Sequence, residues 1–102
     1  MATKTKLIPL EQMEDAAYCL RTIAHPHRLR MLEMLLGGEY TVGELAGACG
    51  IRSHQASEHL GKMRDRGLLE PVRHGQRTYY KIAEPALENI LACIRQRFHI
   101  ED

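Results

Sequence analysis

Apolar residues recur along the chain at two spacings, and these spacings predict its elements. Helical spacing runs over residues 10–24, 26–36, 42–48, 53–67 and 84–98, whereas short apolar or alternating runs occupy 68–72 and 78–82. A helical spacing indicates a helix with one buried face, and two short β-rich runs around a glycine indicate a hairpin. The pattern therefore predicts a mainly α domain with one small hairpin, in the order four helices, two strands and a last helix.

Two short helices in the middle of the chain carry the clearest local signals. Thr41 and Glu44 form the sequence pattern of a capping box, Gly50 ends the first helix, and Ser53 is expected to cap the second. In the second helix an apolar stripe of Ala56, Leu60 and Met63 is expected to face the core. The opposite face is polar and holds His54, Gln55, Ser57, Glu58, Gly61 and Lys62. This arrangement is typical of a helix-turn-helix whose second helix enters DNA.

The hairpin that follows strengthens this interpretation. Its expected turn, residues 73–77, has Gly75 at the centre and an arginine at each end, Arg73 and Arg77. A helix-turn-helix followed directly by a basic-tipped hairpin predicts a winged helix-turn-helix. The alternative is an ordinary α+β core whose basic side chains are only solvated.

Length and composition are those of one ordinary globular domain. The chain has 102 residues, 44% hydrophobic and 26% charged. We expect a winged domain over residues 10–98, preceded by a flexible lead over 1–9 and followed by a tail over 99–102. The chain contains neither a stretch of about 20 apolar residues nor a signal-peptide core, so a cytoplasmic protein without membrane contact is expected.

Positive charge collects on the part of the chain expected to meet DNA. Residues 52–77 hold six basic and three acidic side chains, a net charge of +3, whereas the whole chain has +1 and the remainder therefore −2. Phosphate binding requires such a basic segment.

The first and last predicted helices carry more apolar surface than a small monomer covers. The first has Met13, Leu20 and Ile23 on one face, and the last has Leu87, Leu91 and Phe98. We expect these two helices to pair across a two-fold axis in a homodimer, which also suits two DNA half-sites about one turn apart.

The chain resembles the ArsR/SmtB family of bacterial winged-helix repressors. The resemblance lies in residues 20–32, which are similar to the family's L-x-x-L-A-[DNH]-P-x-R-L-x-I-L block, and in 41–46, 57–60, 63–64, 67–69 and 73–80. These linked motifs span roughly residues 11–98. The resemblance implies a homodimeric repressor that leaves double-stranded operator DNA when an inducer arrives.

The resemblance also implies which side chains meet DNA. These are Ser53, His54, Gln55, Ser57, His59 and Lys62 on the second helix of the motif, and Arg73, His74, Gln76 and Arg77 on the wing. Gln55 is suited to pair with adenine, and the wing to contact backbone or minor groove. For His59 the alternative is a bracing role within the protein. At least one of Arg64 and Arg66 is expected to be solvated or paired near Asp65.

The metal sites of the family do not match this chain, so no metal ligand or other cofactor is predicted. One family site falls on residues 44–46, where no thiol stands, and the other on Glu84, Ala86, Arg97 and Ile100, of which only Glu84 is a ligand type. The alternative is a partial metal site in the tail, formed by His99 and Asp102. We interpret His25 and His27, which flank Pro26, as structural or surface residues.

Three thiols remain as candidates for the inducing signal. Cys19, Cys49 and Cys93 would release DNA on oxidation or reaction with reactive sulfur, although a free cysteine is often only a small buried hydrophobe. The alternatives are a metal- or haem-responsive repressor and a winged-helix interaction module without DNA binding. No nucleophile–base set or phosphate loop is present, so no enzyme is predicted.

Overall fold

The computed structural model describes residues 6–101 and contains five helices and one hairpin within that range. The elements are α1 (Leu10–Ile23), α2 (Pro26–Gly37), α3 (Val42–Cys49), α4 (Ser53–Asp65), β1 (Leu69–His74), β2 (Arg77–Ile82) and α5 (Leu87–Arg97). The order is the predicted one, and the winged helix-turn-helix prediction is confirmed. Residues 1–5 of the expected lead, and Asp102 of the expected tail site, lie outside the described residues.

Local sequence signals set the ends of the central helices. The predicted capping box is present, since Thr41 Oγ1 accepts from the Glu44 N–H at 3.2 Å and Glu44 Oε1 accepts from the Thr41 N–H at 2.8 Å. Just beyond the C-terminal end of α4, Gly67 has a φ of +76°. The Leu68 N–H then donates to the Met63 carbonyl at 3.0 Å. This reversal satisfies the last carbonyls of α4 and turns the chain into β1.

The wing consists of β1, β2 and the two-residue turn between them. The antiparallel pairing runs from Leu69 opposite Ile82 to His74 opposite Arg77, and Gly75 in the turn has a φ of +65°. Both strands are longer than predicted because the tight turn lets pairing continue to His74 and Arg77. A bridge between Thr41 and Tyr79 fastens the wing to the start of α3.

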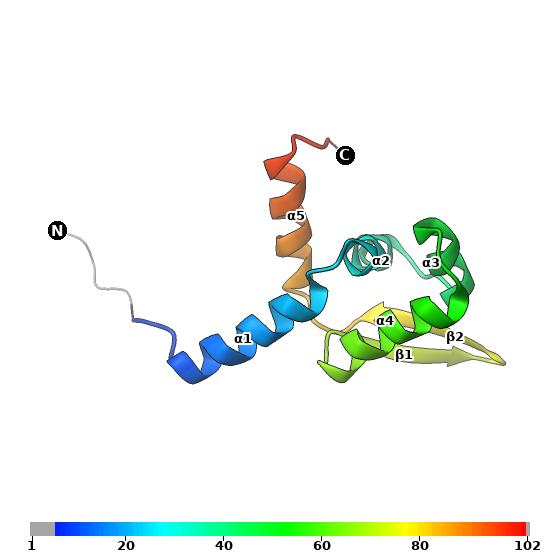
Figure 1. The fold of residues 1–102 in the computed structure, drawn as a ribbon, viewed down its shortest axis with the longest axis horizontal. Coiled ribbons are helices and arrows are strands. Elements are labelled where there is room, and N and C mark those ends of the chain that lie inside the picture. The colour runs from blue at the N-terminus through cyan, green and yellow to red at the C-terminus, as the bar shows by residue number, and fades with distance from the viewer. Residues whose placement is uncertain (1–5, 102) are drawn as a thin grey trace.

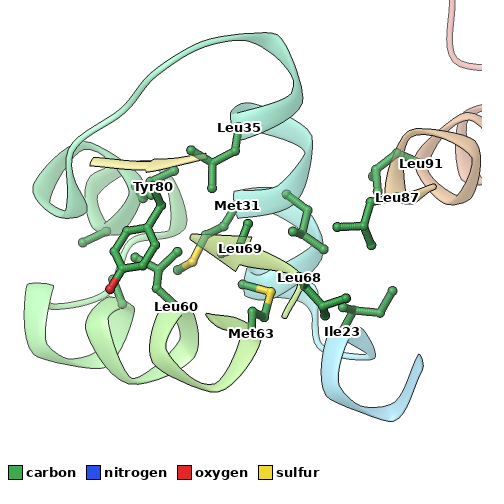
Figure 2. Packing of buried hydrophobic residues seen from close by; sticks show 14 residues of the cluster. Ile23, Met31, Leu35, Leu60, Met63, Leu68, Leu69, Tyr80, Leu87 and Leu91 are labelled. Atoms are coloured by element: carbon green, nitrogen blue, oxygen red, sulfur yellow. The ribbon is translucent and has the colours of Figure 1, made fainter. Parts of the chain in front are cut away.

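The core lies between α2, the inner side of α4 and the wing. Met31, Leu60 and Met63 are fully buried, and Tyr80 closes the wing side (Figure 2). The remaining buried apolar residues shown in Figure 2 include Ile23, Leu35, Leu68, Leu69, Leu87 and Leu91. This packing fixes how α4 is turned, because its apolar stripe must face inward.

One predicted cap and one predicted helix start are wrong. Ser53 does not cap α4: Arg52 holds the cap position with extended backbone (φ −80°, ψ 155°), and Ser53 is the first helical residue. The last helix begins at Leu87 rather than near Glu84, because residues 84–87 form a tighter turn. In that turn the Leu87 N–H donates to the Glu84 carbonyl, while the Glu84 side chain accepts from the Ala86 N–H.

The two terminal helices project from the body as separate arms (Figure 1). Large apolar residues stay exposed here in a single protomer: Leu10, Met13 and Leu20 on α1, and Phe98 and Ile100 just beyond α5. None of the helices between residues 6 and 101 is both long and apolar enough to cross a bilayer.

Candidate nucleic-acid interface

The two faces of α4 differ sharply in chemistry. Ala56, Leu60 and Met63 are fully buried on the inner face. The outer face exposes Ser53, His54, Gln55, Ser57, Glu58 and Lys62. The second helix of a helix-turn-helix needs such a surface, because its side chains must hydrogen-bond to base edges and phosphates.

Gln55 also has a structural role that the sequence analysis missed. Its Oε1 accepts from the Arg52 N–H at 3.0 Å, so it satisfies an otherwise unpaired donor at the start of α4. The spacing of three residues, with Gln at the third helical position, is the signal that would have revealed it. Capping uses only the amide oxygen, and the amide nitrogen, which carries two donors, stays available to a ligand.

His59 lies apart from the exposed side chains of α4. It is half-buried, and its Nδ1 accepts from Arg28 Nε at 3.0 Å. Arg28 in turn donates through Nη1 to the Thr22 carbonyl at 2.6 Å. Burial lowers the pKa of His59, and the neighbouring His25 and Arg28 charges lower it further. These contacts favour the bracing role for His59 over contact with a base.

The tip of the wing is basic and exposed. Arg73, His74, Gln76 and Arg77 are all exposed, and the His74 ring rests edge-on against Tyr79 at 5.2 Å between centroids. Within residues 6–101, neither Arg73 nor Arg77 forms an ion pair, whereas Lys81 is paired with Glu70 across the strands at 3.1 Å. The two tip arginines are therefore available to phosphates.

The two arginines at the end of α4 are engaged within the protein. Arg64 pairs with Asp65 at 3.1 Å, as expected for at least one of them. Arg66 pairs with Asp15 at 2.9 Å and lies over the Tyr18 ring at 3.8 Å. The ion pair between Arg66 and Asp15 joins the end of α4 to α1. It was not predicted, because the two residues are 51 positions apart.

The three cysteines are free thiols in different surroundings. Cys19 is half-buried and borders an apolar pocket of about 290 Å³ between α1 and α5, lined also by Leu20, Leu87 and Ile90. Cys49 is half-buried with Sγ 3.7 Å from the His27 carbonyl, and burial raises the pKa of its thiol. Cys93 is exposed on α5. The accessible thiol is thus on an arm, not beside α4.

Metal-ligand types gather at a place the sequence analysis passed over. At the positions that match a family metal site, Glu84 is engaged with the Ala86 N–H and Arg97 lies over the Phe98 ring. By contrast, His25, His27 and His59 each offer a nitrogen within 4.8 Å of the others. Spacing gives no signal for this cluster, because His59 is 32 residues beyond His27.

A helix-turn-helix with a polar outer helix, joined to a hairpin with a basic tip, defines the class: a winged helix-turn-helix DNA-binding protein. Comparison with known proteins narrows this class. A helix-turn-helix domain family model matches residues 23–72. HTH-type transcriptional regulator YgaV of Escherichia coli is 39% identical over 93 residues, 89% of this chain and 94% of that protein.

Two further similarities agree. The biofilm growth-associated repressor of Agrobacterium fabrum is 34% identical over 91 residues, 85% of this chain and 78% of that protein. The structure of the homodimeric winged helix-turn-helix domain of Mb0332 from Mycobacterium bovis, described as a possible ArsR-family regulator, matches with a TM-score of 0.76 and 28% identity, covering 97% and 91% of the two chains. The chain belongs to the ArsR/SmtB family of winged helix-turn-helix transcriptional regulators, and it is a regulator rather than an enzyme.

Proposed function

We propose that the protein is a homodimeric repressor that reads paired half-sites of operator DNA with α4 and is released when a thiol on its dimer arms is modified. The single observation that carries the DNA-binding part is the division of α4 into a buried apolar face and an exposed hydrogen-bonding face. The relatives named as regulators and repressors support the same conclusion.

In this proposal each part of the interface has its own task. Gln55, Ser57 and the neighbouring polar residues of α4 meet base edges in the major groove. Lys62 and the wing arginines Arg73 and Arg77 bind phosphate or minor groove, which supplies affinity without reading sequence. His59 positions α4 through Arg28 instead of contacting a base.

The dimer is supported by the exposed apolar residues of the arms. Leu10 is 77% exposed and Phe98 63% exposed, although both belong to apolar stripes. Burying these stripes against a second copy removes that surface from water and sets two α4 helices at a fixed spacing. The homodimeric state of the Mb0332 domain agrees with this assembly.

The signal is proposed to act on the arms because that is where an accessible thiol lies. Cys93 is exposed on α5, and Cys19 borders the pocket between α1 and α5. Oxidation or persulfidation there changes the packing of the dimer helices and, through them, the spacing of the two α4 helices. Cys49 is the weakest candidate, since its thiol is half-buried against the His27 carbonyl and burial raises its pKa.

Fluorescence anisotropy tests this proposal with a duplex from the region upstream of the protein's own coding sequence. Fully reduced protein is expected to bind this duplex more tightly than a scrambled duplex of equal length. A mild thiol oxidant should abolish binding, and a reductant should restore it. Cys93→Ser should keep the reduced affinity and lose the response, with Cys49→Ser as the matched control that keeps both. Equal binding to both duplexes would contradict operator reading, and tight binding in both redox states would leave the cysteines as packing residues.

A further inference from the structure

Three imidazoles meet where the start of α2 lies against α4. His25 precedes α2, His27 is in its first turn, and His59 comes from the inner side of α4. Ring centroids are 4.6 Å apart for His25 and His59, 5.0 Å for His25 and His27, and 5.9 Å for His27 and His59. All three residues are half-buried, so the cluster is partly shielded from solvent. Neither DNA reading nor the thiol response uses His25 or His27.

We propose that His25, His27 and His59 together bind one divalent transition-metal ion of the Zn²⁺ class. Imidazole nitrogen suits Zn²⁺, Cu²⁺ and Ni²⁺, and three such ligands leave a fourth position for water. Metal–nitrogen bonds of about 2.0–2.1 Å place tetrahedral ligand nitrogens roughly 3.3–3.4 Å apart. The three nitrogens already lie within 4.8 Å of one another, so each pair must close by no more than about 1.5 Å to reach this spacing.

Two ring nitrogens of the cluster already accept hydrogen bonds, so an ion that binds through them must replace these partners. His59 Nδ1 accepts from Arg28 Nε at 3.0 Å, and His25 Nδ1 accepts from the His27 N–H at 3.1 Å. A nitrogen that accepts a hydrogen bond holds the lone pair that a metal needs, so both rings present a lone pair at Nδ1 to an ion that binds there. When the hydrogen bond from Arg28 Nε to His59 is broken, the guanidinium keeps its hydrogen bond from Nη1 to the Thr22 carbonyl.

The positive charge of Arg28 opposes a cation at the same place. The site is therefore expected to bind more weakly than a structural zinc site built of thiolates, and removing the charge is expected to strengthen it. The bound ion joins α2 to α4, and because the unfolded chain lacks the assembled site, binding raises the melting temperature. Since this property belongs to the protein without DNA, it holds or fails separately from operator binding.

Calorimetric titration of metal-free, reduced protein with Zn²⁺ tests the proposal, and competition with a chromogenic chelator gives the affinity. We expect one Zn²⁺ per protomer and a higher melting temperature with Zn²⁺. His27→Gln and His59→Gln should each weaken binding by at least about tenfold, because each removes a ligand. Arg28→Met should bind at least as tightly as the unmodified protein.

The controls are His54→Gln, an exposed histidine of the same helix outside the cluster, and Cys49→Ser, whose sulfur lies near the His27 carbonyl. Both should bind Zn²⁺ like the unmodified protein. His27→Gln changes a side chain that does not cap α2, so it keeps the test valid if His59→Gln fails to fold. Full Zn²⁺ affinity in His27→Gln, or loss of binding in either control variant, would overturn the proposal.

Discussion

The half formed by α3, α4 and the wing differs from the half formed by α1 and α5 in where its apolar residues lie. In the first half Leu45, Leu60 and Met63 are fully buried within one protomer. In the second, Leu20 is 51% exposed and Phe98 63% exposed, although both sit on apolar stripes. This difference supports the proposed dimer, because the half assigned to DNA reading buries its apolar residues within a single chain, whereas the arms leave theirs exposed for a second copy.

The largest effect that separates the two halves is expected from core truncation. Leu60→Ala removes a fully buried side chain from the inner face of α4 and should lower the free energy of unfolding by about 2–5 kcal/mol in urea titrations. Leu20→Ala, the matched control on α1, should instead weaken self-association in sedimentation experiments. If Leu20→Ala cost as much as Leu60→Ala under conditions where the protein is monomeric, α1 would belong to the same core as α4.

Gln55→Ala examines the outer face of the same helix. We expect a loss of roughly 1–3 kcal/mol in binding to the cognate operator and relaxed preference at one base position, measured by anisotropy on single-base variants of the duplex. Because Gln55 also accepts from the Arg52 N–H, a thermal melt of the variant must accompany the binding data. Operator affinity that stays unchanged would remove Gln55 from the readout and leave it as a cap.

These first two variants show how much the sequence predicts about α4 and its neighbour α3. Spacing alone separates Leu60 from Gln55, and the predicted Thr41–Glu44 capping box and the end of α3 at Gly50 are both confirmed. All of these signals act within a few residues. The contacts of Arg28 with His59 and of Arg66 with Asp15 join residues 31 and 51 positions apart. Periodicity gives the inner face of a helix but not the partner that it meets, so these contacts and the histidine cluster required the structure.

Gly67→Ala tests the connection between α4 and the wing. The φ of +76° is unfavourable for a residue with Cβ, so this variant should lose about 1–2 kcal/mol of stability. Gly47→Ala in α3 is the control. A Cβ added at this position would meet nothing within 4 Å, and the helix favours alanine, so a gain of about 0.5–1 kcal/mol in stability is expected. Chemical denaturation of both variants measures the difference. Equal effects would show that the left-handed turn is not what makes Gly67 necessary.

Arg77→Ala tests the tip of the wing. All duplexes should be bound more weakly to a similar extent, and the slope of log affinity against log salt should become shallower by about one, because one phosphate contact is lost. Lys81→Ala, which removes a lysine already paired with Glu70, should change the slope less. A change in sequence preference for Arg77→Ala would mean that the wing reads bases.

The smallest effect concerns the cap of α3. Hydrogen bonds from the backbone and side chain of Thr41 lower the pKa of Glu44 below its ordinary value of 4.5. A depressed pKa in the folded state gives stability that is present above the ordinary value and is lost as the pH falls through the lowered one. Glu44→Gln should therefore flatten the acid limb of stability against pH. An identical acid limb in both proteins would contradict a role for the ionised carboxylate.

The proposed repressor is a dimer that presents two α4 helices to operator DNA. Hydroxyl-radical footprinting of the reduced protein, on DNA from upstream of its own coding sequence, tests this most directly. We predict two protected half-sites related by a dyad and centred about 10 base pairs apart, each lost in Arg73→Ala/Arg77→Ala protein. A single protected patch without symmetry, or uniform protection at every sequence tested, would contradict the central claim.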